Sequence, residues 1–299
     1  MSNSNSDMAA CGLKRIMKKH LNLARLGQIS TLFSERGWDD MAIPANKLRY
    51  DNFCSSFGQL KDDEFQLIME LTSRFHCMTF IELVEEFLSG YYSVPDNIIQ
   101  RCHHLLIVPM KKMYRSGRCM RKFKSGDMLM AQMQQVDDIC YYNDKFVYCK
   151  NAIEVARNYQ QGDLVCFIDD FVGTGRTFYE AYQTTCNYLS THNIALSTVD
   201  CIGVSAWAMR QGLLACQARG LRLYSFRVFQ KEISDFYPRP QNMAHLLRMY
   251  NMEKTVCDKI TGKFRFGFGH CEALVSIAGR CANNTFPVYW KTRNATFPR

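Results

Sequence analysis

The spacing of apolar residues changes about a third of the way along the chain. Up to residue 98, apolar residues recur every three or four positions, which is the spacing of helices with one buried face. Such stripes lie at residues 21–33, 53–57, 65–71 and 81–88. We therefore expect residues 1–98 to form a small all-helical domain of short helices.

From residue 99 the apolar residues come in short continuous runs instead. These runs predict strands at residues 104–110, 164–168, 197–204 and 221–229, with helical patterns between them. Strands that alternate with helices are joined by parallel crossovers. Residues 99–299 are thus expected to form an α/β domain with a mostly parallel sheet. The segment 91–96, which contains Pro95, is the expected boundary.

The apolar run at 164–168 leads into two acids, Asp169 and Asp170, and then into a loop with Gly173 and Gly175. The carboxyl ends of parallel strands form the edge at which open α/β sheets bind ligands. A glycine-rich turn before a helix can direct several N–H groups at one point, which suits a phosphate. Because the acids repel a phosphate, we expect them to accept hydrogen bonds from sugar hydroxyls or to hold Mg²⁺ beside a diphosphate.

Two common phosphate motifs do not fit this loop. The P-loop requires a lysine and a glycine spacing that are absent, and a dinucleotide fingerprint requires a third glycine where Phe178 stands. The order of apolar strand, two acids, two apolar residues, one variable residue and T-G-x-T instead resembles the signature of type I phosphoribosyltransferases. It spans residues 167–177 without a gap. The competing interpretation is an ordinary buried strand followed by a glycine-rich turn.

The resemblance implies a role for each residue of the motif. Asp169 and Asp170 would contact the ribose 2′- and 3′-hydroxyls of phosphoribosyl diphosphate, and would hold Mg²⁺ indirectly. The loop would wrap the 5′-phosphate with Gly173, Thr174, Gly175, Arg176 and Thr177. Members of the hypoxanthine type have an aspartate, a candidate base, at the variable position. This chain has Gly173 there, so that role is unfilled.

Composition limits the class of protein. At 299 residues and 47% hydrophobic content the chain is long enough for two domains and a real core. It has no apolar run of 18 residues, and its first ten residues lack the apolar segment of a signal peptide, so we expect a cytoplasmic protein without a membrane span. Its 14 cysteines form no C-x-x-C pair, which favours free thiols over a zinc site or a disulfide framework.

The net charge of +9 is unevenly distributed. Basic residues cluster at 14–25, and seven more lie between residues 109 and 126 without an acid. Such patches are typical of proteins with a polyanionic partner, nucleic acid or diphosphate, and the alternative is a solvated basic face. In type I phosphoribosyltransferases a diphosphate-binding loop follows the first strand, and the resemblance implies this role for Lys111, Arg115, Ser125 and Gly126. The alternative is a basic surface loop.

The end of the chain resembles a variable hood that covers the acceptor in phosphoribosyltransferases. Asn283, Asn284 and Trp290 could supply amide hydrogen bonds and a stacking face for a base, or could belong to an Asn-rich turn before an edge strand. The whole arrangement over residues 99–299 resembles the phosphoribosyltransferase-like effectors of bacterial conflict systems, some of them encoded beside retrons. This implies a toxin or antiviral defence role, restrained by a partner that includes a reverse transcriptase and its DNA–RNA product.

The sequence is compatible with three functions. The first is an enzyme that transfers the sugar of phosphoribosyl diphosphate or breaks an N-glycosidic bond of a nucleotide, with Mg²⁺ as the expected cofactor. The second is a nucleotide sensor or nucleic-acid-binding regulator on the same fold, without turnover. The third is transcription regulation through residues 1–98. The acid pair favours the enzyme, whereas Gly173 favours the sensor. The acceptor and the oligomeric state, homo-oligomer included, stay open.

Overall fold

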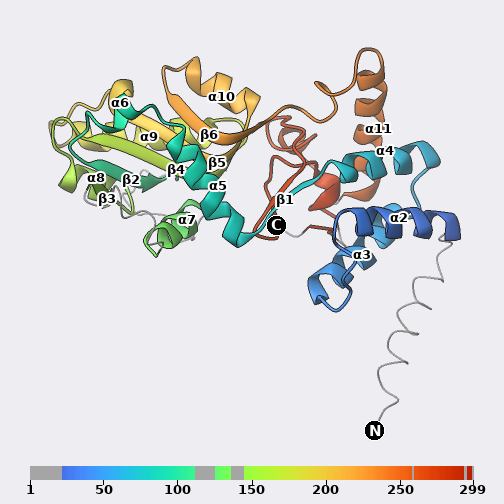
Figure 1. The fold of residues 1–299 in the computed structure, drawn as a ribbon. Helices are drawn as coiled ribbons and strands as arrows, with labels where there is room; N and C mark the ends of the chain where they lie inside the picture. Colours follow the sequence, from blue (N-terminus) through green and yellow to red (C-terminus); the bar gives the residue numbers. More distant parts are fainter. Residues whose placement is uncertain (1–21, 112–124, 136–144, 258, 293–294, 298–299) are drawn as a thin grey trace, which may run out of the picture. The chain divides into compact units, whose positions relative to one another are not determined.

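The computed structural model describes residues 22–111, 125–135, 145–257, 259–292 and 295–297. Its contacts divide the chain into two compact units (Figure 1). One unit, the sheet unit, comprises residues 78–231. The other, the aromatic unit, combines residues 1–77 with residues 232–299.

A five-stranded sheet forms the centre of the sheet unit. Its strands are β2 (Leu105–Pro109), β3 (Phe146–Tyr148), β4 (Leu164–Val172), β5 (Cys201–Met209) and β6 (Arg222–Phe229). Every pairing is parallel, and the order is β3-β2-β4-β5-β6. All residues of β2 and β5 are buried, as expected of strands covered on both faces. The prediction of an α/β fold with a mostly parallel sheet is confirmed.

Helices cover both faces of this sheet (Figure 1). On one face lie α5 (Phe80–Tyr92) and α7 (Ser125–Met133), which contact each other; α6 (Asp96–Ile99) is a short turn before β2. On the other face lie α8 (Ala152–Asn158), α9 (Arg176–Ser190) and α10 (Arg210–Gln217). Helix α5 begins with a capping box in which Thr79 and Glu82 bond each other's backbone N–H groups, at 3.3 and 2.7 Å.

The strand order places a switch point between β2 and β4. The chain runs from β2 outward to the edge strand β3, then returns across β2 to β4 and continues to β5 and β6. Helix α7, after β2, and helix α9, after β4, consequently lie on opposite faces. Open α/β sheets bind ligands at the carboxyl ends of strands where the crossovers diverge in this way. The ends of β2 and β4 are therefore the expected place for a site.

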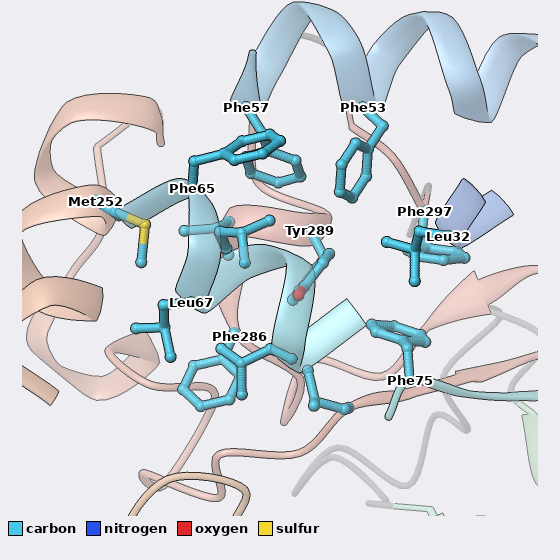
Figure 2. Close-up of a cluster of buried hydrophobic side chains, with 14 of the residues drawn as sticks. Leu32, Phe53, Phe57, Phe65, Leu67, Phe75, Met252, Phe286, Tyr289 and Phe297 are labelled. Carbon is cyan, nitrogen blue, oxygen red and sulfur yellow. The ribbon is translucent and has the colours of Figure 1, made fainter. Parts of the chain in front are cut away.

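The aromatic unit contains α2 (Leu23–Glu35), α3 (Pro44–Phe57), α4 (Asp62–Ser73) and α11 (Gln241–Val256). A small sheet joins β1 (His76–Met78), β7 (Val275–Ile277) and β8 (Arg280–Cys281). Figure 2 shows the buried cluster at its centre, to which helices from the start of the chain and loops from its end both contribute. Phe75 and Phe297 stack with ring centroids 4.3 Å apart, and Phe57 meets Tyr289 edge-on at 5.8 Å.

This shared core explains why the division differs from the expected boundary at residue 98. The tail, residues 232–299, packs with the N-terminal helices, and α5 packs on the sheet. Burying Phe286, Tyr289 and Phe297 requires an apolar partner surface, which the inward stripes of α3 and α4 supply. The Thr72 and Tyr289 hydroxyls add a buried hydrogen bond of 2.9 Å. Periodicity reveals such stripes, but it does not reveal which distant segment covers them.

Two expectations from composition can be compared with the described residues. None of the helices described is both long and apolar enough to cross a bilayer. The cysteines described are free thiols, most of them buried. Burial raises the pKa of Cys54 and Cys149 to about 12 and that of Cys216 to about 11, so these thiols stay protonated and unreactive at neutral pH.

Candidate functional site

The acid pair lies at the carboxyl end of β4, inside the strand rather than after it. The strand continues past the two acids to Val172, and its pairing with β5 keeps one register, with Asp169 opposite Ser205 and Phe171 opposite Trp207. The Asp170 N–H donates to Asp169 Oδ1 at 3.1 Å, and the Phe171 N–H donates to Asp170 Oδ1 at 2.8 Å. Both side chains are half-buried.

Helix α7 brings a third polar side chain to this pair. The Ser125 hydroxyl, in the first turn of α7, donates to Asp169 Oδ1 at 2.9 Å. The next residue is Gly126, where a Cβ would lie 2.9 Å from the Ile168 carbonyl oxygen and 3.1 Å from Pro109 Cβ. A residue without a side chain thus lets α7 begin directly over the ends of β2 and β4. Of the residues expected in a diphosphate loop, Ser125 therefore meets the acid pair, and Gly126 packs on the strand ends beside it.

Lys111 holds the start of α7 in place. Its ammonium group forms a salt bridge with the Asp127 carboxylate at 2.5 Å, and the two side chains are only 8% and 15% exposed. The pair ties the end of β2 to the first turn of α7, next to Ser125. A diphosphate would have to compete with Asp127 for Lys111, so that role stays a prediction. Arg115 lies outside the described residues.

The surroundings of the acid pair favour a shared proton. Burial raises the pKa of Asp169 well above its usual range, the neighbouring Asp170 charge raises it further, and the Ser125 hydrogen bond offsets part of the rise. Burial also raises the pKa of Asp170, and its interaction with Asp169 offsets part of that rise. The pair retains a proton to higher pH than two separate aspartates until a cation or hydroxyl donors displace it.

The loop after β4 ends in a left-handed glycine. Gly175 caps α9 with φ of 71°, a conformation that favours glycine, and the Arg176 N–H turns to the Thr174 hydroxyl at 3.3 Å. The first N–H groups of a helix have no partner within that helix and carry its partial positive charge. Thr177 lies in this first turn with an exposed side chain. The arrangement is chemically suited to an anion.

Helix α10 supports the loop from behind. A Cβ at Gly212 would lie 2.6 Å from the Gly173 carbonyl oxygen, and a Cβ at Gly175 would lie 2.7 Å from Cys216 Sγ. Backbone therefore packs directly on backbone, and the shape of the loop depends on Gly212. Sequence reasoning missed this residue. The available signal was a glycine inside a helical pattern, which is unfavourable unless another backbone approaches closely.

Arg176 points along the surface of α9. Its guanidinium pairs with Glu180, one turn later, at 2.8 Å and is 61% exposed. An exposed pair of this kind contributes little free energy, so a bound phosphate can compete for Arg176.

The residues expected in a hood belong to the aromatic unit. Asn284 is buried, and its amide donates to the Phe268 carbonyl at 2.9 Å and to Cys271 Sγ at 3.1 Å. The Trp290 indole, also buried, donates to the Thr285 carbonyl at 2.8 Å. These bonds stabilise the Asn-rich turn itself. They agree with the alternative interpretation, in which this segment is a structural turn. Asn283 is half-buried, and contact of these residues with a base stays a prediction.

The acid pair can serve as part of a metal site only together with other ligands. The described part of the chain contains no group of three or more histidine, cysteine, aspartate or glutamate side chains that could hold a metal. Mg²⁺ commonly uses one or two carboxylates and completes its shell with substrate phosphates and water. Two adjacent carboxyl groups that share a proton fit this pattern. The Mg²⁺ expectation therefore stays a prediction tied to a phosphorylated substrate.

The model of the PRTase-CE family matches residues 50–299, which include the acid pair, the loop and the tail. The match begins inside α3, within the helices that share a core with the tail. No curated protein and no solved structure matches the chain.

Proposed function

The chain belongs to the PRTase-CE family, a phosphoribosyltransferase-like effector family, and from this premise we propose that it acts on a compound containing ribose 5-phosphate. The first candidate is phosphoribosyl diphosphate, and the second is a nucleotide. The reaction is transfer of the ribosyl group or cleavage of the N-glycosidic bond. The observation that carries the proposal is the acid pair with Ser125, placed beside the phosphate-type loop at the switch point of the sheet.

In this proposal Asp169 and Asp170 hold the sugar. The 2′- and 3′-hydroxyls are adjacent donors, and two adjacent carboxyl groups can accept a hydrogen bond from each. Ser125 keeps the Asp169 carboxyl group oriented while this exchange takes place. Fixing the sugar ring in this way removes much of the entropy cost of reaching the transition state.

The loop residues 173–177 bind the 5′-phosphate. The left-handed turn at Gly175 and the N-terminus of α9 supply N–H donors and partial positive charge, and the Thr174 and Thr177 hydroxyls can add hydrogen bonds. Gly212 keeps the loop close to α10, so the phosphate meets a preformed site. Because carboxylates repel a phosphate, the phosphate binds in the loop, and Asp169 and Asp170 remain free to bind the ribose hydroxyls.

Bond breaking at the sugar carbon develops positive charge on the ring and negative charge on the leaving group. Mg²⁺, when bound, would neutralise charge on a departing diphosphate. The carboxylates beside the ring favour the developing positive charge. Since position 173 is glycine, no base comes from it, and water, an amine or a nucleic-acid base stays open as acceptor.

The family supports a role beyond metabolism. We propose that the protein is a toxic effector of a bacterial antiphage system of the retron type, acting in the cytoplasm. A partner that includes a reverse transcriptase and a DNA–RNA hybrid would restrain it. The basis is the effector character of the family.

Turnover tests the enzyme directly. The full chain is incubated with labelled phosphoribosyl diphosphate or nucleotides and Mg²⁺, and products are followed by chromatography. We expect products from the wild type and from Asp96→Asn, a control that removes an exposed acid of the sheet unit. Asp169→Asn and Asp170→Asn should lose most activity. Equal turnover by all four proteins would contradict the proposal.

The second candidate is a sensor that binds the same compounds without turnover. Gly173, at the position where some phosphoribosyltransferases carry an aspartate, favours it. Binding that depends on the acid pair, without product from any substrate offered, would support the sensor over the enzyme.

A further inference from the structure

Lysines surround an aromatic ring in the aromatic unit, in the segment after α11. The Lys263 and Lys291 ammonium groups lie 5.2 and 5.9 Å from the centre of the Phe264 ring. Phe264 is half-buried and packs against Phe268 at 5.6 Å and Trp290 at 6.1 Å. Lys291 also lies 5.9 Å from the Trp290 ring. Part of the Phe264 ring therefore reaches solvent between two cations.

A second ring continues the same surface. The Arg265 guanidinium lies 4.2 Å from the centre of the Tyr250 ring, and the Lys254 ammonium lies 5.1 Å from it. The end of α11 carries Tyr250 and Lys254 and is joined to both neighbouring segments, because Glu253 accepts the Phe266 N–H at 2.8 Å and Cys257 pairs with Thr292. The two rings and their cations therefore lie on neighbouring segments and form one patch. We call it the Phe264 patch and define it by Tyr250, Lys254, Lys263, Phe264, Arg265 and Lys291.

Acidic residues are scarce in the segment of the chain that carries most of the Phe264 patch. From Lys259 to the end of the chain there are seven lysines and arginines and a single acid, Glu272. Glu272 is 2% exposed and accepts bonds from the Ser234 N–H and hydroxyl at 2.7 and 2.6 Å, so its charge is used inside the protein. Asp258, just before Lys259, lies outside the described residues.

The carboxyl group beneath the patch adds little negative charge. Glu253 is 1% exposed, and its Oε1 accepts the Phe266 N–H at 2.8 Å. Burial raises the pKa of Glu253 to about 7, so it is only partly ionised at neutral pH. Its Oε2 forms a long salt bridge of 3.8 Å with the Arg265 guanidinium, which is 23% exposed. The ammonium groups of the three lysines in the patch are thus left for an external anion.

From the patch's charge and its rings we propose that it binds single-stranded nucleic acid. Several cations in a row match a chain of phosphates better than they match the single phosphate of a mononucleotide. Half-exposed rings offer stacking faces to unpaired bases, and a duplex hides those faces. A base stacked on a ring is also held more strongly than an exposed lysine, so it can displace the ammonium groups. The proposal is independent of the enzymatic one.

Fluorescence anisotropy of the full chain with a labelled oligothymidylate of 20 nucleotides tests the electrostatic part. Lys263→Gln/Lys291→Gln should weaken binding and reduce the slope of log affinity against log salt by about 1.4, at ~0.7 per lost phosphate contact. The matched control, Lys47→Gln/Lys61→Gln, removes the same charge from exposed positions of the same unit. It should change affinity by less than about twofold.

The stacking part is tested by Phe264→Leu, which keeps an apolar side chain but removes the ring. Affinity for the single strand should fall roughly tenfold with the salt slope unchanged. Circular dichroism melts show whether the variant is folded, and the lysine variants test the proposal if it is not. Duplex DNA of the same length bound as tightly as the single strand would overturn the proposal. Binding of a mononucleotide but not of the single strand would also overturn it. So would a loss of affinity in Lys47→Gln/Lys61→Gln equal to that in Lys263→Gln/Lys291→Gln.

Discussion

The Ser125 hydroxyl donates a hydrogen bond of 2.9 Å to Asp169, although the two residues are 44 positions apart in the chain. This bond joins the crossover after β2 to the acids at the end of β4. It is the contact that turns two adjacent carboxylates on a strand into a site with a third polar group. The predictions below concern the parts that hold this arrangement together.

Ser125→Ala tests the bond itself. The hydroxyl stabilises ionised Asp169, so its loss should raise the pKa of that carboxyl group further and leave it protonated more often. We expect affinity for ribose 5-phosphate to fall about fivefold near pH 7, equivalent to one hydrogen bond, and to recover partly at higher pH. Titration calorimetry at two pH values measures this. Ser190→Ala, at an exposed serine of α9, is the control. Equal affinities of both variants at every pH would contradict the assigned role.

Asp169→Asn tests the pH dependence of stability. The folded-state pKa of Asp169 is raised above its unfolded value, so folding favours the protonated form. The resulting stability is fully present below the unfolded pKa and is lost as pH rises through the folded pKa. Asparagine cannot ionise, so the variant should be more stable than the wild type at pH 8, by roughly 0.5–2 kcal/mol. At acidic pH the two should converge.

Denaturant unfolding of both proteins at pH 4 and pH 8 measures the difference. The same variant should lose affinity for ribose 5-phosphate, which separates stability from function. If the wild type were instead more stable than the variant at pH 8, ionisation of Asp169 would not destabilise the folded protein, which contradicts this prediction.

Gly212→Ala tests the support of the loop. The new Cβ would lie 2.6 Å from the Gly173 carbonyl oxygen, so backbone must move. We expect a loss of about 1–3 kcal/mol in the free energy of unfolding, as for overpacked cores, with weaker phosphate binding. Gly27→Ala is the control, and its effect should have the opposite sign, because a Cβ at this helical glycine would have no atom within 4 Å. The variant should gain up to about 1 kcal/mol in the free energy of unfolding. Thermal melts of both variants give the comparison.

Lys111 has two possible roles that a double variant separates. Lys111→Met removes the ammonium group from a mostly buried carboxylate, which should cost about 3 kcal/mol of stability. Adding Asp127→Asn removes the stranded charge and should restore most of that loss. If Lys111 only positions α7, the double variant also regains affinity for phosphoribosyl diphosphate. Restored stability without restored affinity would show that Lys111 binds the diphosphate itself.

The sequence predicted what is local in this protein. The strand, the acids and the loop are contiguous, so their order alone indicated a ligand site at the end of β4. The apolar runs also located β2, β4, β5 and β6, with bounds that differ by up to five residues. One local detail differed: Asp169 and Asp170 lie inside β4, because the strand continues beyond them and pairs with β5 as far as Val172.

The rest depends on contacts between distant segments. Neither periodicity nor composition indicates that Gly212 meets Gly173, or that Tyr289 and Phe297 complete a core begun by Phe57 and Phe75. A run of basic residues likewise does not reveal that Lys111 faces Asp127. These relationships arise when the sheet and the aromatic core form, and only the folded chain contains them.

Calorimetric titration of the full chain with phosphoribosyl diphosphate and Mg²⁺ tests the central claim most directly. The claim is that residues 173–177 bind the 5′-phosphate while Asp169 and Asp170 hold the ribose hydroxyls. We predict saturable binding by the wild type and by Asp96→Asn, and affinity reduced at least tenfold in Asp170→Asn, which loses a charged hydrogen-bond acceptor. No measurable binding by the wild type, or equal affinity in all three proteins, would contradict it.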